Sequence, residues 1–180
     1  MNAAAPPGPR TLVAGVGNLF LGDDGFGVEA ARLLSGQELP PGVEVADIGI
    51  RGVHLAYQLL DGYDTLVLLD ATARGGKPGT LYVIDATEPG SRPPPKSVPL
   101  DGHRMSPDAV LALLDTLCAG TGAAPPRRTL VVGCEPAAVE EGIGLNPAVA
   151  AALPEAVRMV VGLLRDPASG PVHRTGQASV

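Results

Sequence analysis

Short apolar runs alternate along the chain with segments in which apolar residues recur at helical spacing. A continuous apolar run is typical of a strand buried on both faces, and apolar residues three and four positions apart are typical of a helix. This pattern predicts strands at residues 11–16, 43–48, 65–70, 79–85 and 128–133. It predicts helices at residues 26–34, 54–60, 106–117 and 146–164. Because the two kinds of element alternate, we expect an α/β fold with three layers, in which helices cover both faces of a twisted, mostly parallel five-stranded sheet.

The same pattern gives the expected limits of the folded part. The chain has 180 residues, a length that fits one domain better than two. Residues 1–10 form a proline-rich lead-in and residues 166–180 form a tail without periodic apolar positions, and we predict that both are disordered. A single α/β domain is therefore predicted over residues 11–165. Within it, helical spacing places Tyr57 and Leu60 in the core.

Composition and charge disfavour several classes of protein. Thirteen basic residues stand against 19 acidic ones, which gives a net charge of −6. Nucleic acids and anionic membranes attract basic proteins, so we expect neither as a partner. The N-terminus lacks the apolar core of a signal peptide, and no uninterrupted apolar run reaches the roughly 18 residues that a membrane span needs. We therefore expect a cytoplasmic protein.

Candidate chemistry follows the carboxyl ends of the predicted strands. Ligands of open α/β sheets bind outside this edge. The first strand runs into the segment GVGNLFLGDDGFG, the third strand ends in Asp70, and His103 precedes the third predicted helix. With this topology, Asp23 or Asp24 can converge with Asp70 and His103. Two carboxylates and an imidazole form a mixed set of oxygen and nitrogen ligands, which suits a borderline divalent metal such as nickel or zinc.

Spacing alone leaves other interpretations open. The acid pair of the first loop is also typical of a helix cap, Asp70 of a residue that caps a turn, and His103 of an ordinary loop histidine. GVGNLF begins like a dinucleotide fingerprint, but Phe20 stands where the fingerprint has its third glycine and two acids follow, so we expect no nucleotide. Cys134 together with His103 suggests a cysteine protease, but no motif around GCEP supports a nucleophile.

Taken together, these motifs resemble those of the hydrogenase maturation proteases. The resemblance lies in GVGNLFLGDDGFG, in the strand that ends in Asp70 and is followed by Ala-Thr, in His103 ahead of a helix, and in the later motifs GCEP and GIGLNP. It covers nearly the whole predicted domain, from about Thr11 to Leu164. It implies a twisted, mostly parallel sheet flanked by helices. It also implies a hydrolase that removes a C-terminal extension from a nickel-iron hydrogenase large-subunit precursor already carrying nickel.

The resemblance also implies a metal-contacting set. The family's metal-contacting residues correspond to Asp24, Asp70 and His103, and the metal expected here is nickel presented by the precursor. Asp24 stands where the family often has glutamate, whose side chain reaches one methylene further. Asp23 aligns with a family acid too, and we interpret it as a cap of the following helix.

A glycine-rich loop, DIGIRG, matches the loop that follows the second strand in the family. From this correspondence we expect Gly49, Arg51 and Gly52 to bind substrate. Two mechanisms of peptide cleavage stay open: a carboxylate activates water as a general base, or the metal polarises the carbonyl as a Lewis acid. We expect nickel to position the substrate and Asp24 or Asp70 to act on the water, which makes these two aspartates the candidate catalytic residues.

Two other functions compete with this interpretation. One is a non-catalytic checkpoint that binds the nickel-loaded large subunit without cutting it. The other, on the same class of fold, is a cofactor-binding oxidoreductase.

Overall fold

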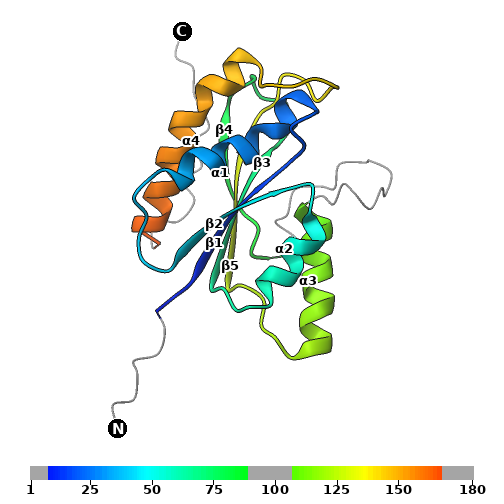
Figure 1. Ribbon diagram of the computed structural model, residues 1–180, viewed down its shortest axis with the longest axis vertical. Helices are drawn as coiled ribbons and strands as arrows, with labels where there is room; N and C mark the ends of the chain where they lie inside the picture. The colour runs from blue at the N-terminus through cyan, green and yellow to red at the C-terminus, as the bar shows by residue number, and fades with distance from the viewer. Residues whose placement is uncertain (1–7, 89–106, 168–180) are drawn as a thin grey trace.

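A computed structural model of the chain describes residues 8–88 and 107–167 (Figure 1). The strands are β1 (Thr11–Val16), β2 (Val43–Gly49), β3 (Thr65–Ala71), β4 (Leu81–Asp85) and β5 (Arg128–Cys134). The helices are η1, a 3₁₀ helix (Gly22–Gly25), and α1 (Phe26–Ser35), α2 (Gly52–Leu59), α3 (Pro107–Thr121) and α4 (Pro147–Arg165). The predicted order of strands and α-helices is confirmed, with boundaries that differ by a few residues. Most of the predicted lead-in and tail lies outside the described residues.

The five strands form one sheet in the order β2-β1-β3-β5-β4. β1 runs parallel to β2 and β3, β3 runs parallel to β5, and β4 lies antiparallel to β5 at the edge. Figure 1 shows α1 and α4 on one face of the sheet and α2 with α3 on the other. The predicted three-layer α/β fold with a mostly parallel sheet is therefore confirmed.

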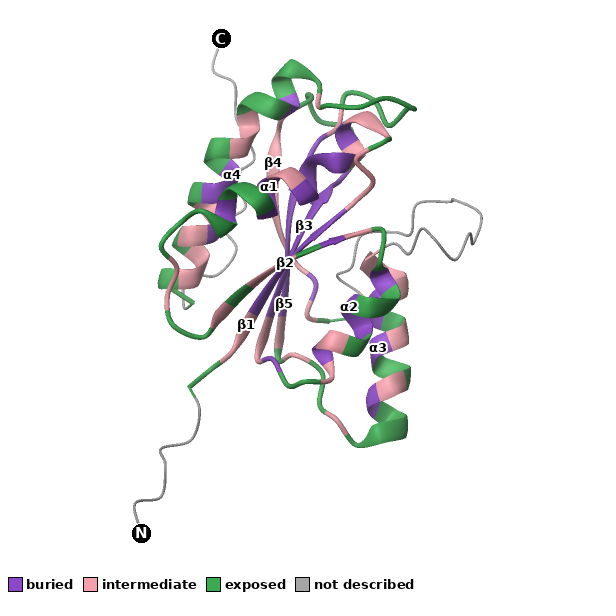
Figure 2. Ribbon diagram, viewed as in Figure 1, coloured by how far each residue is buried: buried purple, intermediate pink, exposed green. Residues whose placement is uncertain are grey.

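Successive side chains of the central strands enter two separate cores. On β3, Leu66 and Leu68 belong to the core beneath α2 and α3, whereas Val67 and Leu69 belong to the core beneath α1 and α4. Both faces of the strand are covered, which explains why its sequence is a continuous apolar run. Figure 2 shows the burial that results, with buried residues along the sheet and exposed residues on the outer sides of the helices.

One predicted core residue lies on the surface. The side chain of Tyr57 is 57% exposed, so its placement in the core is wrong. α2 packs on the core through Leu55, Ala56 and Leu59. Tyr57 is two positions from both leucines, and residues two apart on a helix point to different sides. Leu60, the other predicted residue, does pack against this core.

α4 is, by length and composition only, long and apolar enough to cross a membrane. One side of it packs into the core that it shares with α1 through Val149, Ala156, Val157 and Val160. Core helices of soluble proteins meet the same criterion. The start of α4 is the one that the sequence predicts. The Asn146 side chain accepts a hydrogen bond from the N–H of Ala148, and Pro147 is the first helical residue.

The order of the strands reverses direction between β1 and β3. From β1 the chain passes through α1 to β2 on one side, and α2 then returns it to β3 on the other side of β1. Connections that leave adjacent strands in opposite directions open a crevice at the carboxyl ends of those strands. The loop after β1 and the end of β3, which carry Asp24 and Asp70, both lie at this position.

Candidate active site

The loop after β1 folds tightly back on the sheet, and glycines make this possible. Gly17 has a φ of 131°, and a Cβ there would lie 1.8 Å from the carbonyl oxygen of Asp24. A Cβ at Gly27 would lie 2.0 Å from the carbonyl oxygen of Leu69 and 2.3 Å from that of Val16. Glycine at these positions therefore lets η1 and α1 begin directly against the ends of β1 and β3.

Asp24 lies in η1, which contacts β3. Its side chain is half-buried, and Oδ2 accepts a hydrogen bond from the backbone N–H of Asn18 at 2.8 Å. The carboxylate is thereby oriented by its own loop at the edge where β3 ends. This matches the place that the sequence predicts for it.

Asp70 is 8% exposed near the end of β3, where it pairs with Gly133 of β5. By the alternation of side chains along a strand, it shares the face of Leu66 and Leu68, the face that α2 and α3 cover. A carboxylate in such surroundings is costly unless it has partners. Asp70 therefore lies at the predicted place, and its role at the metal stays a prediction.

The third predicted ligand, His103, lies outside the described residues and precedes α3 in the sequence. Within residues 8–88 and 107–167, no group of three or more His, Cys, Asp and Glu side chains is arranged to hold a metal ion. The set of Asp24, Asp70 and His103 therefore stays a prediction, with its two aspartates at the same edge of the sheet.

Asp23 does not cap a helix, and that prediction is wrong. It is 1% exposed, and its carboxylate reaches across to the loop that joins β5 to α4. Oδ2 accepts hydrogen bonds from the N–H groups of Ala137 at 2.7 Å and Ala138 at 3.1 Å, and Oδ1 accepts one from Asn146 at 2.6 Å. These bonds to an ionised acceptor are of the strong kind. Asp23 thus holds two loops of the candidate site together, whereas its neighbour Asp24 faces its own loop.

The DIGIRG loop reaches the same edge of the sheet. Gly49 has a φ of 57°, and its carbonyl accepts a hydrogen bond from the N–H of Gly17 at 3.0 Å. Gly52 is buried as the first residue of α2. The guanidinium of Arg51 donates hydrogen bonds to two carbonyls at the end of β2. The structure brings this loop beside the first one and gives Arg51 a role in shaping it; substrate binding by these three residues stays a prediction.

Cys134 is fully buried at the end of β5. Burial, reinforced by the negative charge of Asp23, raises the pKa of its thiol to about 12. The thiolate is the reactive form of cysteine, and its formation is suppressed here at neutral pH. The geometry therefore argues against a cysteine nucleophile, in agreement with the sequence.

Glu135 is a structural residue of the site to which the sequence argument assigned no role. It is 5% exposed directly after β5. Its carboxylate accepts hydrogen bonds from the N–H of Arg74 at 2.8 Å, the N–H of Gly75 at 3.2 Å and the hydroxyl of Tyr82 at 2.8 Å. It fixes the loop that follows Asp70. The sequence does carry a signal for Glu135, because an acid at the end of an apolar strand is the same feature that singles out Asp70.

The stability of the protein should depend on the ionisation of Glu135 in acid. Burial tends to raise the pKa of this carboxyl, but the hydrogen bonds that it accepts outweigh burial and lower the pKa below its usual 4.5. A lowered pKa in the folded state contributes stability above the unfolded-state pKa, and this stability is lost as the pH falls through the folded-state value. Glu135→Gln should therefore be less stable than wild type at about pH 6, and the difference should narrow toward about pH 3.

Urea unfolding at several pH values measures this difference. Glu38→Gln, at an exposed glutamate, is the matched control. A gap between wild type and Glu135→Gln that stays constant from about pH 6 to pH 3 would contradict the assigned role.

Comparison with known proteins identifies the family. The family model described as hydrogenase maturation protease matches residues 28–163. The chain is 35% identical over 162 residues to hydrogenase expression/formation protein HupD of Rhizobium leguminosarum bv. viciae, covering 89% of this chain and 76% of that protein. It is also 35% identical over 162 residues to the hydrogenase 2 maturation protease of Escherichia coli K12, covering 87% and 92%.

Solved structures agree with the sequence comparison. The hydrogenase maturating endopeptidase HybD from E. coli is similar with a TM-score of 0.66 and 32% identity, over 88% of this chain and 94% of that one. A hydrogenase 2 maturation peptidase from a Thaumarchaeota archaeon gives a TM-score of 0.64 and 31% identity, over 87% and 98%. The fold, the sequence match and these relatives agree, and the chain therefore belongs to the hydrogenase maturation protease family of peptidases.

Proposed function

We propose that this hydrogenase maturation endopeptidase removes a C-terminal extension from a nickel-iron hydrogenase large-subunit precursor, and that it does so only after the precursor has received nickel. In this proposal the reaction takes place in the cytoplasm. The nickel belongs to the substrate, and the enzyme recognises it with Asp24, Asp70 and His103. No nucleotide takes part, since Phe20 and the two following acids replace what a dinucleotide site needs.

The observation that carries the proposal is the meeting of two carboxylate segments at the switch point of the sheet. η1, which holds Asp24, contacts β3, which ends at Asp70 and Ala71. Carboxylate oxygens together with an imidazole nitrogen suit divalent nickel. Because the protease supplies only some of the ligands and the precursor the others, the shared ligand set makes binding depend on the loaded metal.

The same carboxylates supply a candidate base for hydrolysis. One of Asp24 and Asp70 accepts a proton from water as the water attacks the scissile carbonyl, and it returns that proton to the leaving amine as the C–N bond breaks. The other aspartate helps to hold the nickel-bearing segment. The protein binds the peptide through the loop of Gly49, Arg51 and Gly52, whose backbone lies beside the first loop. This is carboxylate-dependent peptide hydrolysis and needs no cysteine nucleophile.

Intact-mass spectrometry tests the proposal directly. Nickel-loaded and nickel-free precursors are incubated with the protein, and the masses are followed with time. We expect loss of a C-terminal peptide from the loaded precursor only. Cleavage of both forms would contradict the nickel requirement. An unchanged mass in a loaded precursor that binds the protein would contradict cleavage and leave a checkpoint that only binds.

A further inference from the structure

We propose that a rigid apolar surface beside Asp24 docks the large-subunit precursor by binding an apolar segment that is flanked by basic residues. The surface consists of Phe20, Val139 and Ile143, and we call it the loop platform. The inference rests on the proposed function, because the occupant is the same precursor. It adds a second contact, made by side chains other than the proposed nickel ligands, that selects the partner.

The loop platform is built by pairing between two distant segments. Leu21 and Gly142 form a parallel β-bridge. The N–H of Gly22 donates to the carbonyl of Gly142 at 2.9 Å, and the N–H of Gly142 donates to the carbonyl of Phe20 at 2.9 Å. The buried carboxylate of Asp23 holds the second of these segments at another point, where it accepts hydrogen bonds from the N–H groups of Ala137 and Ala138. These bonds fix the two loops before any partner arrives, and a surface that is already ordered loses little entropy on binding.

Apolar side chains project outward from this ordered scaffold. Phe20 is 69% exposed, Ile143 is 84% exposed and Val139 is 44% exposed. Single exposed apolar residues are common, whereas several large ones gathered on a rigid support are typical of an interaction site. Phe20 and Ile143 lie on opposite sides of the bridge, so the platform presents apolar groups from both segments.

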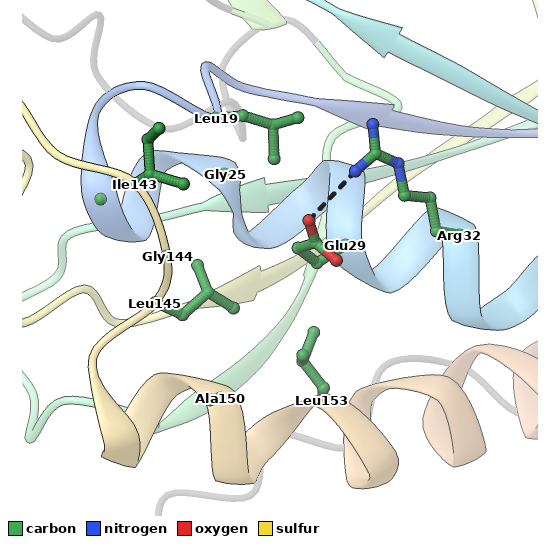
Figure 3. Close-up of a pocket in the computed structure, with 10 residues that line it drawn as sticks. Leu19, Gly25, Glu29, Arg32, Ile143, Gly144, Leu145, Ala150 and Leu153 are labelled. Atoms are coloured by element: carbon green, nitrogen blue, oxygen red, sulfur yellow. Dashed lines mark hydrogen bonds and ion pairs between the residues drawn. The ribbon is translucent and has the colours of Figure 1, made fainter.

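A pocket continues the platform toward α1 and α4. It has a volume of about 360 Å³, and its walls are mostly apolar. Figure 3 shows Leu19, Ile143, Leu145 and Leu153 around the pocket, with Glu29 and Arg32 at one side. Ile143 belongs to both the loop platform and the pocket lining, and it joins the two features. The pocket has room for an apolar side chain of the partner, in the manner of an anchor residue.

The charges around this surface favour a basic neighbour in the partner. Glu140 and Glu141 are exposed between Val139 and Ile143. At the other end, Arg32 forms ion pairs with both Glu29 and Asp47 and is therefore already neutralised. The electrostatic potential around the surface is therefore negative, owing to Glu140 and Glu141. Complementary charge determines which partners are attracted. The predicted occupant is thus an apolar segment that carries lysine or arginine beside its anchor.

The position of the surface links docking to the reaction. Gly22 and Gly25 line the pocket, and Asp24 lies between them in η1. A precursor seated on the loop platform would hold its nickel-bearing region next to this carboxylate. Holding a substrate in the reactive orientation by itself accelerates a reaction strongly.

Steady-state processing of the nickel-loaded precursor tests the inference. The test variant is Phe20→Ser with Ile143→Ser, in the full chain. The matched control is Val53→Ser with Tyr57→Ser, which removes two exposed apolar side chains from α2. We expect the platform variant to raise the KM at least about tenfold with little change in kcat, as for the loss of interface hot spots. The control should keep the wild-type KM, and all three proteins should share one unfolding midpoint.

A charge variant probes the same surface independently of its apolar side chains. Glu140→Lys with Glu141→Lys should raise the KM at low salt, and the rise should shrink as salt screens the charges. A wild-type KM in both platform variants, with the precursor cleaved, would overturn the inference and leave the proposed function intact. A raised KM in the α2 control alone would place the docking surface on α2.

Two further results would also count against the inference. A wild-type dimer in light scattering that the platform variant lacks would show that a second copy of this chain, and not the precursor, covers the surface. Failure of the wild-type protein to cleave any loaded precursor would remove the proposed function and this inference with it.

Discussion

Asp70→Asn should abolish processing of the nickel-loaded precursor while the protein stays folded. Asparagine has nearly the same shape as aspartate, so packing at the end of β3 is kept. It has no negative charge to attract nickel and it cannot act as a base at neutral pH. The loss of a general base slows a reaction by about 10²- to 10⁴-fold, and the loss of a metal contact adds to this. Intact-mass time courses measure the rate, and circular dichroism with the unfolding midpoint measures the fold.

Asp85→Asn is the matched control for Asp70→Asn. Asp85 also ends a strand, but β4 is antiparallel to β5. Asp85 therefore pairs with Leu130 near the start of β5, at the amino ends of the parallel strands and away from the candidate site. Its carboxylate accepts a hydrogen bond from the N–H of Thr87 at 2.9 Å. We expect Asp85→Asn to process the precursor at the wild-type rate. Normal processing by Asp70→Asn would remove Asp70 from the mechanism.

Substitution of the two neighbouring acids, Asp23 and Asp24, should separate stability from activity. Asp23→Asn replaces a buried carboxylate that accepts three backbone hydrogen bonds, and it brings an amide donor against N–H groups. We expect a loss of about 2–4 kcal/mol in the free energy of unfolding. Asp24→Asn affects a half-buried group with one backbone bond, so its loss of stability should stay below about 1 kcal/mol.

Activity should follow the reverse order. Asp24→Asn should stop cleavage of the loaded precursor, while Asp23→Asn should keep its kcat at temperatures where it is folded. Urea unfolding and intact-mass kinetics on the same preparations give both quantities. Equal losses of stability in the two variants would contradict the separate roles, and so would full activity in Asp24→Asn.

The strands and helices could be predicted from sequence because the burial of each one leaves a simple pattern of apolar residues. β1 and β3 are buried on both faces, and their uninterrupted apolar runs have few other interpretations. Tyr57 was misplaced because α2 presents more than one apolar side, and sequence alone does not say which side meets α3. The strand order, and with it the switch point between β1 and β3, also depends on packing between elements and not on local pattern.

The candidate site was predictable in part for a related reason. Asp70 lies at the end of a strand and the pair Asp23–Asp24 lies in the loop after one, so the rule that ligands bind at the carboxyl edge finds both places. The choice of Asp24 over Asp23 comes from the family resemblance. The partners of Asp23 are 114 to 123 positions away along the chain, and no local spacing encodes such a pairing. Helix capping was the nearest local explanation for this residue, and it was wrong. His103 is a candidate from its place before the third predicted helix and from the family resemblance, and it lies outside the described residues.

The long-range hydrogen bonds of Asp23 have a consequence for the folding of the enzyme during translation. When translation has passed β3, the nascent chain already contains Asp24 and Asp70, but the peptide groups that Asp23 binds have not been made. Domains fold as units once enough of the chain has emerged. The first loop therefore receives its final support only from residues 137–146, in the last third of the sequence. A prematurely terminated product would carry Asp24 on a loop that lacks these bonds, so incomplete synthesis should not release an active peptidase.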